Sequence, residues 1–252
     1  MIEAEFVDRY GPKVVVALLL TFASGIVDII GYLGVFHLFT AHMTGTTVQL
    51  GHNFITRDWV NVFASATIVA AFVGGSILGR VLIEIGSRRR IRRIASVTLT
   101  IEALLLASLT QAHLHYAGKP YWGLAILAAA MGVQTATLTG IGPLTVHTTF
   151  VTGMLNKMAQ LVTRIAFRMH DLSRLRPGVP RARREQRDDV QMTLFLLGVW
   201  LFYVGGAAIG TWSFRSWGLR ALFIAIGLLA IGFATDLFWP LSIKEEKEQR
   251  ER

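Results

Sequence analysis

The sequence predicts an all-α integral membrane protein with six transmembrane helices, arranged as two inverted three-span repeats, each with a polar re-entrant helix after its first span. Composition indicates the membrane, because 53% of the 252 residues are hydrophobic and only 16% are charged, which is outside the range of soluble domains. Six apolar stretches account for the spans, and two Thr-Gly steps in matching places indicate the repeat. We therefore expect a single membrane domain over residues 1–252.

Each of the six apolar stretches is long enough for a transmembrane helix, which needs about 20 mostly apolar residues. They cover residues 13–36, 60–85, 94–113, 121–141, 190–213 and 219–240. Two further stretches, 38–55 and 145–168, are long enough for a helix but contain many polar side chains. These two are predicted to dip into the membrane and return to the same face.

The distribution of positive charge supports this topology. Basic residues cluster at 88–93, 174–187 and 244–252, and such clusters stay on the cytoplasmic side of a membrane. Six crossings with both termini in the cytoplasm place all three clusters there. Full crossing by both polar stretches would give eight spans and would separate 88–93 from 174–187, so this alternative is disfavoured. The basic cytoplasmic loop at about 170–189 is also expected to contact anionic lipid headgroups.

The two halves contain similar motifs in the same order. MTGT at 43–46 corresponds to VTGM at 151–154, and FVGGSILG at 72–79 corresponds to YVGGAAIG at 203–210. Repeat 1 is expected at about 10–115 and repeat 2 at about 118–241. Three spans is an odd number, so the repeats must be inverted. Inverted repeats with interrupted helices are typical of secondary transporters, whereas a duplicated bundle without a transport role is the alternative.

The Thr-Gly steps are the predicted binding site. A helix that begins inside the membrane directs free N–H groups and the positive end of its dipole into a cavity, which favours a carboxylate-bearing ligand. Glycine permits close approach, and threonine can cap exposed amides. Hydrogen bonding between helices is the plainer alternative for each polar side chain. The residues predicted to line the site are Thr44, Gly45, Thr46, Gln49, Gln134, Thr152, Gly153 and Asn156.

Asp28 is predicted to be the proton-coupling residue. It lies deep in the first apolar stretch, where a charge costs about 3 kcal/mol or more unless it is paired or protonated. His42 is expected to line the cavity as its proton partner, while a static hydrogen bond or ion pair is the alternative reading of Asp28. Glu102 is also mid-span and would either pair with a basic group or stay protonated. Glu84 and Asp236 lie near span ends, where they can reach the headgroups.

No cofactor, metal or nucleic-acid partner is predicted. The spacing of His37, His42 and His52 matches no metal-ligand pattern, and cysteines, a Walker loop and a dinucleotide fingerprint are all absent. The net charge of +9 sits in short runs between apolar spans, which indicates orientation in the bilayer rather than nucleic-acid binding. Glycines four apart in GGSILG and GGAAIG indicate close helix contact within the protein or in a homodimer.

The stretches ASGIVDIIGYLGVFHLFTAHMTGTTVQLG and MGVQTATLTGIGPLTVHTTFVTGMLNKMAQ together resemble the YoaK-like family of bacterial six-span membrane proteins, a family defined by a domain of unknown function. The positions that match the family pattern are Asp28, Met43, Thr44, Gly45, Gln134, Thr152 and Gly153. Thr46 and Thr135 stand where the family pattern has asparagines. The resemblance implies six spans in a bacterial inner membrane and a transport role, without a substrate.

The sequence therefore predicts a secondary transporter, not an enzyme, that moves a small carboxylate-bearing metabolite across the inner membrane. Two alternatives from other classes stay open. An intramembrane enzyme acting on a lipid or isoprenoid would use Asp28 and His42 as a close acid–base pair. A non-catalytic membrane scaffold would hold Asp28 in a fully satisfied set of contacts.

Overall fold

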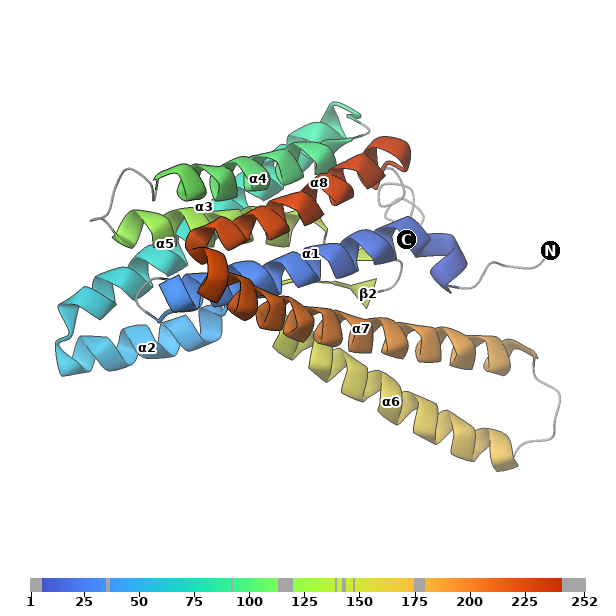
Figure 1. The fold of residues 1–252 in the computed structure, drawn as a ribbon. Coiled ribbons are helices and arrows are strands. Elements are labelled where there is room, and N and C mark those ends of the chain that lie inside the picture. Colours follow the sequence, from blue (N-terminus) through green and yellow to red (C-terminus); the bar gives the residue numbers. More distant parts are fainter. Residues whose placement is uncertain are drawn as a thin grey trace.

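The computed structural model describes residues 6–34, 37–91, 93–112, 120–138, 140–141, 144–146, 148–174 and 180–241. Within these residues the chain forms eight α-helices, a short 3₁₀ helix and one β-hairpin (Figure 1). The helices are α1 (Phe6–Gly34), α2 (Met43–Thr56), α3 (Trp59–Arg88), α4 (Ile94–Ala112), α5 (Pro120–Thr137), α6 (Val151–Arg174), α7 (Pro180–Trp217), η1 (Gly218–Ala221) and α8 (Leu222–Phe238). Strands β1 (Gly140–Ile141) and β2 (Leu144–Thr145) pair antiparallel.

Every predicted apolar stretch forms a helix, in the order α1, α3, α4, α5, α7 and α8, and the two polar stretches form α2 and α6. The fourth stretch ends earlier than predicted, because α5 stops at Thr137 and the β-hairpin follows. The sequence GIGP at 140–143 explains the stop, since glycine and proline interrupt helices. The segment 170–189 was expected to be a loop, but most of it is the end of α6 and the start of α7.

The helices define an all-α membrane protein. Three helical segments are long and apolar enough to cross a membrane: Tyr10–Gly34, Trp59–Arg88 and Glu185–Phe238, the last comprising most of α7 together with η1 and α8. A shorter apolar helix covers Ile94–Thr110. Large apolar side chains on the outer surface, such as Leu104, Trp122 and Leu194, are exposed, as expected where lipid is the surrounding solvent.

The helices pack in pairs around α1. In the candidate span that α1 provides, 67% of the most apolar window is buried, against 28% for α3, so α1 is the central helix and α3 is peripheral. The closest pairs are α1 with α7 and α3 with α5. Helix α2 lies on α3, and α6 lies on α7. Helices α4 and α8 pack on each other, and α4 also packs on α5 while α8 packs on α1. The same set of main pairs results when each helix of α1–α4 is exchanged with the corresponding helix of α5–α8, so that α1 takes the place of α5, α2 that of α6, and so on.

Glycines allow the two closest pairs to approach. A Cβ atom on Gly75 would overlap with the backbone carbonyl of Ala129, and one on Gly132 would overlap with that of Phe72. These two residues therefore let the backbones of α3 and α5 touch. In the α1–α7 pair the corresponding obstacles are the carbonyls of Phe22 for Gly206 and Tyr203 for Gly25.

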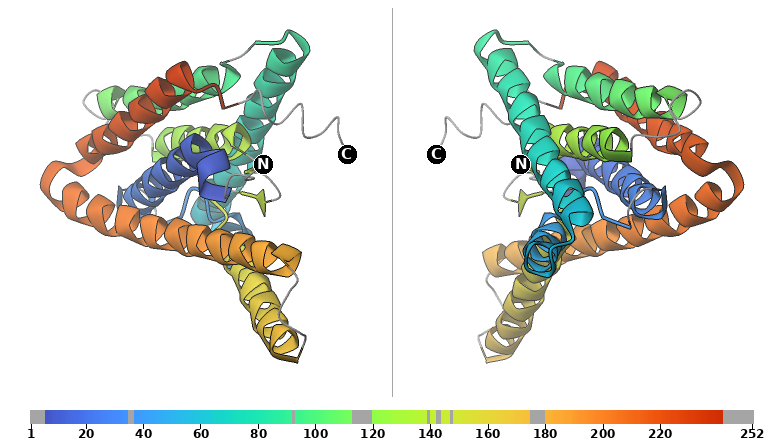
Figure 2. Two further views of the ribbon diagram at one scale, coloured as in Figure 1. Left: turned by 90° about the vertical axis from the view of Figure 1, so that its right-hand side faces the viewer. Right: turned by 90° about the vertical axis from the view of Figure 1, so that its left-hand side faces the viewer.

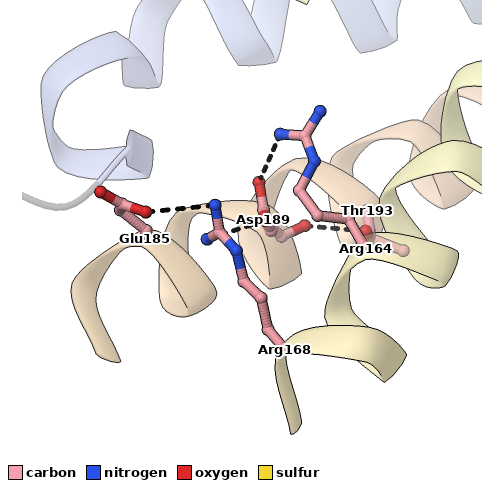
Figure 3. A network of polar contacts seen from close by, with 5 residues as sticks. All are labelled: Arg164, Arg168, Glu185, Asp189 and Thr193. Atoms are coloured by element: carbon pink, nitrogen blue, oxygen red, sulfur yellow. Dashed lines mark hydrogen bonds and ion pairs between the residues drawn. The ribbon is translucent and has the colours of Figure 1, made fainter. Parts of the chain in front are cut away.

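Two helical hairpins extend toward opposite ends of the molecule, α2 with α3 and α6 with α7 (Figures 1 and 2). Ion pairs join the outer part of the second hairpin (Figure 3). Arg164 Nη1 lies 3.3 Å from Asp189 Oδ1, and Arg168 lies 3.2 Å from Asp189 Oδ2 and 3.1 Å from Glu185 Oε2. Charged side chains are costly in hydrocarbon, so an aqueous or headgroup environment suits this end of α6 and α7.

Candidate functional site

The buried carboxylate of Asp28 is the centre of the candidate site. It lies on α1 about two turns before the helix ends, and only 3% of the residue is exposed. Oδ1 accepts hydrogen bonds from the backbone N–H of Thr40 at 2.7 Å and of Ala41 at 2.8 Å, and from Thr40 Oγ1 at 3.2 Å. Oδ2 accepts one from the Tyr203 hydroxyl on α7 at 2.7 Å. Four donors thus surround one carboxylate.

These hydrogen bonds hold the segment before α2 deep inside the helix bundle. After α1 ends at Gly34, the chain turns back so that the amides of Thr40 and Ala41 reach Asp28. A Cβ atom on Gly31 would meet the Thr40 side chain, so a glycine there lets the returning segment lie directly on α1. Asp28 therefore satisfies backbone amides that would otherwise be buried without a partner.

The start of α2 explains the first Thr-Gly step. The ring of His42 lies across Gly45, where a Cβ atom would overlap with it. Thr46 Oγ1 is 3.2 Å from the Phe39 carbonyl and 3.1 Å from the His42 carbonyl. His42 occupies the N-cap position, and its side chain makes no capping hydrogen bond. The expectation that Thr44 caps the helix is therefore wrong: Gly45 makes room for a ring, and Thr46 stabilises the turn.

The start of α6 repeats this arrangement. The ring of Phe150 lies across Gly153 just as His42 lies across Gly45, and Met154 N–H donates to the Phe150 carbonyl at 3.3 Å. Thr135 on α5 and Thr149 are joined by a hydrogen bond of 2.8 Å between their hydroxyl oxygens. In both halves, a polar side chain near the end of one helix, α1 or α5, thus binds the segment that leads into the next helix, α2 or α6.

The structure does not gather all of the predicted lining residues into one site. Thr46 and Gln134 are buried, Gly45 and Gly153 are half-buried, and the other four are exposed: Thr44, Gln49, Thr152 and Asn156. Helices α2 and α6 begin near the middle of the molecule and run apart (Figure 1). In the described part of the chain these two helices do not pack along each other. Gln134 Nε2 donates to the Leu20 carbonyl at 2.6 Å.

His42 is exposed, and the donors to Asp28 in the described structure come from Thr40, Ala41 and Tyr203. The close Asp28–His42 pair that the enzyme alternative requires is therefore not formed in this conformation. The other histidine that precedes a Thr-Gly step, His147, lies outside the described residues. Among the residues that the structure describes, no three acidic or histidine side chains are grouped to hold a metal ion.

Sequence reasoning missed Tyr203, Thr40 and Thr149. Tyr203 begins the motif YVGGAAIG, whose glycines indicate the face that contacts another helix. A tyrosine on that face has a hydroxyl that needs a buried partner, and Asp28 was the available acceptor. Thr40 precedes its Thr-Gly step by four residues and Thr149 precedes its own by three, and the sequence carries no signal for either position.

Asp236 has a different role from the one expected. It was predicted to reach the headgroups, but it is fully buried at the end of α8. Its carboxylate accepts hydrogen bonds from the backbone N–H of Ser96 at 2.9 Å, from the Ser96 hydroxyl, and from Leu241 N–H at 2.8 Å. The reason is that α8 ends beside the beginning of α4, so Asp236 supplies the acceptor that the first turn of α4 needs.

The helical architecture, the buried carboxylate and the apolar outer surface define a polytopic membrane protein. A family model described as "Protein of unknown function (DUF1275)" matches residues 16–235, and the chain belongs to this family. It is 32% identical over 166 residues to the UPF0700 transmembrane protein YoaK of Bacillus subtilis strain 168, covering 65% of this chain and 74% of that protein. No solved structure matches the chain.

Proposed function

We propose that the protein is a secondary transporter made of two inverted repeats, α1–α4 and α5–α8, which moves a small carboxylate-bearing metabolite across the bacterial inner membrane. The observation that carries this proposal is the pairing of the helices. Each main contact within or between the halves has a counterpart when the halves are exchanged. Inverted repeats of this kind let a transporter expose one central site alternately to the two sides.

Individual residues correspond in the same way. Gly25 on α1 meets the Tyr203 carbonyl, and Gly132 on α5 meets the Phe72 carbonyl. These two contacts make α5 equivalent to α1 with a constant shift along the sequence. This shift places Thr135 at the position of Asp28. Phe72 likewise corresponds to Tyr203. The first repeat thus has a titratable carboxylate with a hydroxyl donor, and the second has a threonine hydroxyl beside a phenylalanine.

This asymmetry supports a coupling role for Asp28. While ionised, the carboxylate accepts four hydrogen bonds and holds the segment that leads into α2. A protonated carboxyl accepts fewer hydrogen bonds and must itself donate one, so protonation weakens this hold and lets α2 move. The second repeat contains no equivalent switch, because a threonine hydroxyl does not titrate.

The substrate class follows from the helix starts. α2 and α6 direct their N-termini toward the middle of the molecule (Figure 1), and helix N-termini favour negative charge. The glycines four apart, which were expected to contact a helix of the same protein or of a homodimer partner, face helices of the same chain: Gly75 and Gly79 contact α5, whereas Gly206 and Gly210 contact α1. The proposed partners are therefore a small anionic solute and membrane lipids, with energy supplied by an ion gradient.

A membrane scaffold is the second candidate, and the four donors around Asp28 favour it over the enzyme alternative. A scaffold needs a permanently closed set of contacts, whereas a transporter must open it. Measurement of proton movement distinguishes the two.

The topology is the first prediction. We expect a single cysteine at Thr56 to react in intact cells with a membrane-impermeant thiol reagent, and one at Ser173 to react only after permeabilisation, because α2 and α6 extend to opposite faces. The chain has no native cysteine, so the unmodified protein is the control. Labelling of both sites in intact cells would contradict inverted repeats.

Transport is tested in proteoliposomes with a pH-sensitive dye inside and a panel of mono- and dicarboxylates outside. We expect at least one carboxylate to drive proton uptake. The Tyr203→Phe variant removes a single donor to Asp28 and keeps the ring, so it should fold, and its half-maximal transport should shift to higher pH, because protonation of Asp28 no longer breaks the tyrosine hydrogen bond. Absence of proton movement with every solute, together with correct folding, would favour the scaffold.

A further inference from the structure

Glu102 on α4 is a buried carboxyl group that the proposed mechanism does not use. It is fully buried, and neither of its side-chain oxygens has a hydrogen-bond partner in the described structure. Two other buried carboxylates on the apolar helices, Asp28 and Asp236, each accept three or more hydrogen bonds, and buried Asp189 on α7 is paired with Arg164 and Arg168. Glu102 therefore differs from these carboxylates in having no group that stabilises a negative charge.

The depth of Glu102 follows from the packing of α4, α8 and α1. At Gly232 on α8, a Cβ atom would lie 3.5 Å from a side-chain carbon of Leu99 and 3.9 Å from one of Val16. Both α4 and α1 run antiparallel to α8. Ser96, at the start of α4, contacts Asp236 near the end of α8, and Gly34, at the end of α1, lies near Leu219 just before α8 begins. One turn further along each helix, Glu102 and Leu20 are therefore at the same depth.

A second buried polar atom without a hydrogen-bond partner lies at the depth of Glu102 and Leu20. Gln134 on α5 donates its amide to the Leu20 carbonyl at 2.6 Å, but its buried carbonyl oxygen Oε1 has no partner. The amide oxygen is an acceptor, so it can receive a hydrogen bond from a carboxylic acid but not from a carboxylate. Two buried groups with complementary needs thus lie in one layer of the bundle, contributed by α4 and α5, which pack together.

The charged side chains that the structure describes on the surrounding helices are engaged elsewhere or exposed. α5 has no acidic, basic or histidine residue, and Asp236 on α8 binds the start of α4. On α1, Asp28 binds the segment before α2, and buried Lys13 has a partner of its own. The charged side chains of α3 and η1 point outward: Arg80, Glu84, Arg88 and Arg220 are all exposed.

We propose that Glu102 is a proton-binding site in the core of the membrane domain, held as the neutral acid in this conformation and exchanging its proton with water when α4 moves relative to α5 and α8. In the exchange the O–H bond of the carboxyl breaks, the proton passes to water, and a carboxylate remains until a proton returns. Gln134 Oε1 is an unpaired acceptor in the same layer, and only the acid form of Glu102 has a proton to donate to it. The place of this exchange in a transport cycle rests on the proposed function, whereas the protonation itself does not.

Infrared spectroscopy of the purified full-length protein in lipid tests the proposal without any substrate. We expect a protonated-carboxyl C=O band at neutral pH that is lost in Glu102→Gln and that shifts when the sample is transferred to D₂O. Glu84→Gln is the matched control, because Glu84 is an exposed carboxylate paired with Arg88 at 2.8 Å, and the band should survive in it. Glu102→Leu serves as a second variant that also lacks the band and avoids a buried amide.

Each outcome decides one point. A wild-type spectrum without a protonated-carboxyl band assignable to Glu102 would overturn the assignment. A band that persists unshifted after prolonged exposure to D₂O would show a static buried acid and would overturn proton exchange. A shifting band in a protein that transports none of the carboxylates would leave Glu102 as a proton site and remove the proposed transport function, so the two failures are distinguishable.

Discussion

Replacement of Asp28 by asparagine is expected to lower the stability of the folded protein by about 3 kcal/mol, because hydrogen bonds to a buried charged group contribute about 1.5–3 kcal/mol each and an asparagine leaves some of the donors without an acceptor. The asparagine oxygen can still accept from the Thr40 and Ala41 amides. Its NH₂ group must then face the Tyr203 hydroxyl, which now donates to Asp28. Thermal unfolding in detergent, followed by the loss of the monodisperse peak, measures this difference.

Asp58→Asn is the matched control for this substitution. Asp58 is the N-cap of α3 and accepts from Asn61 N–H at 3.3 Å and from its side-chain amide at 2.7 Å. It is half-buried, and asparagine is about as good as aspartate in an N-cap, so the expected loss is below about 0.5 kcal/mol. If Asp28→Asn unfolds at the same temperature as Asp58→Asn, the carboxylate does not hold the segment before α2.

The largest destabilisation by a single methyl group is expected at Gly75. In Gly75→Ala the new Cβ atom overlaps with the backbone carbonyl of Ala129, so α3 and α5 must separate. Overpacking of this kind costs about 3 kcal/mol or more when the obstacle is backbone that cannot rotate away. Gly206→Ala is expected to behave in the same way, since the obstacle there is the Phe22 carbonyl on α1.

The adjacent glycine provides the control. At Gly74 a Cβ atom meets nothing within 4 Å, and alanine in a helix is about 1 kcal/mol more favourable than glycine. Gly74→Ala should therefore be neutral or stabilising, while its neighbour Gly75→Ala loses most of the folded protein in a size-exclusion profile. Equal profiles for the two variants would mean that α3 and α5 are not in backbone contact.

The stability effects at Asp28 and Gly75 bear on different parts of the proposal. Gly75 and Gly206 test the pairing of the helices, which any function requires. Asp28 tests a contact present in one repeat and replaced by Thr135–Thr149 in the other. If substitution of both glycines strongly lowers stability while substitution of Asp28 has a weak effect, the repeat architecture is supported and the proposed role of Asp28 as a protonation switch is contradicted.

Helix positions could be predicted from the sequence because membrane insertion depends on short-range properties. Apolar stretches of about 20 residues form helices wherever they occur in a bilayer, since every backbone group must be satisfied within its own segment. Thus all six apolar stretches became helices, and the glycine motifs marked the faces that touch. The buried position of Asp28 followed from its place in an apolar run.

The partners of these residues could not be predicted in the same way. Asp28 bonds to Tyr203, which is 175 positions away, and Asp236 bonds to Ser96 at a separation of 140. Nothing in the local pattern around Asp236 distinguishes an end of a span that reaches lipid headgroups from one that lies against the start of another helix. The same limit applied to Thr44, whose capping role failed because His42 and Thr46 shape the turn.

The sequence by itself therefore determined the class of protein, the helical segments, the inward-facing glycines and the unusual carboxyl groups, because these depend on hydrophobicity and on spacing along one helix. Only the tertiary structure decided which groups meet. It surrounded Asp28 with donors, placed Asp236 at the start of α4 and left Glu102 without a partner. Hydrogen bonds require atoms within about 3 Å of each other, and that proximity arises from how α1, α4, α7 and α8 pack.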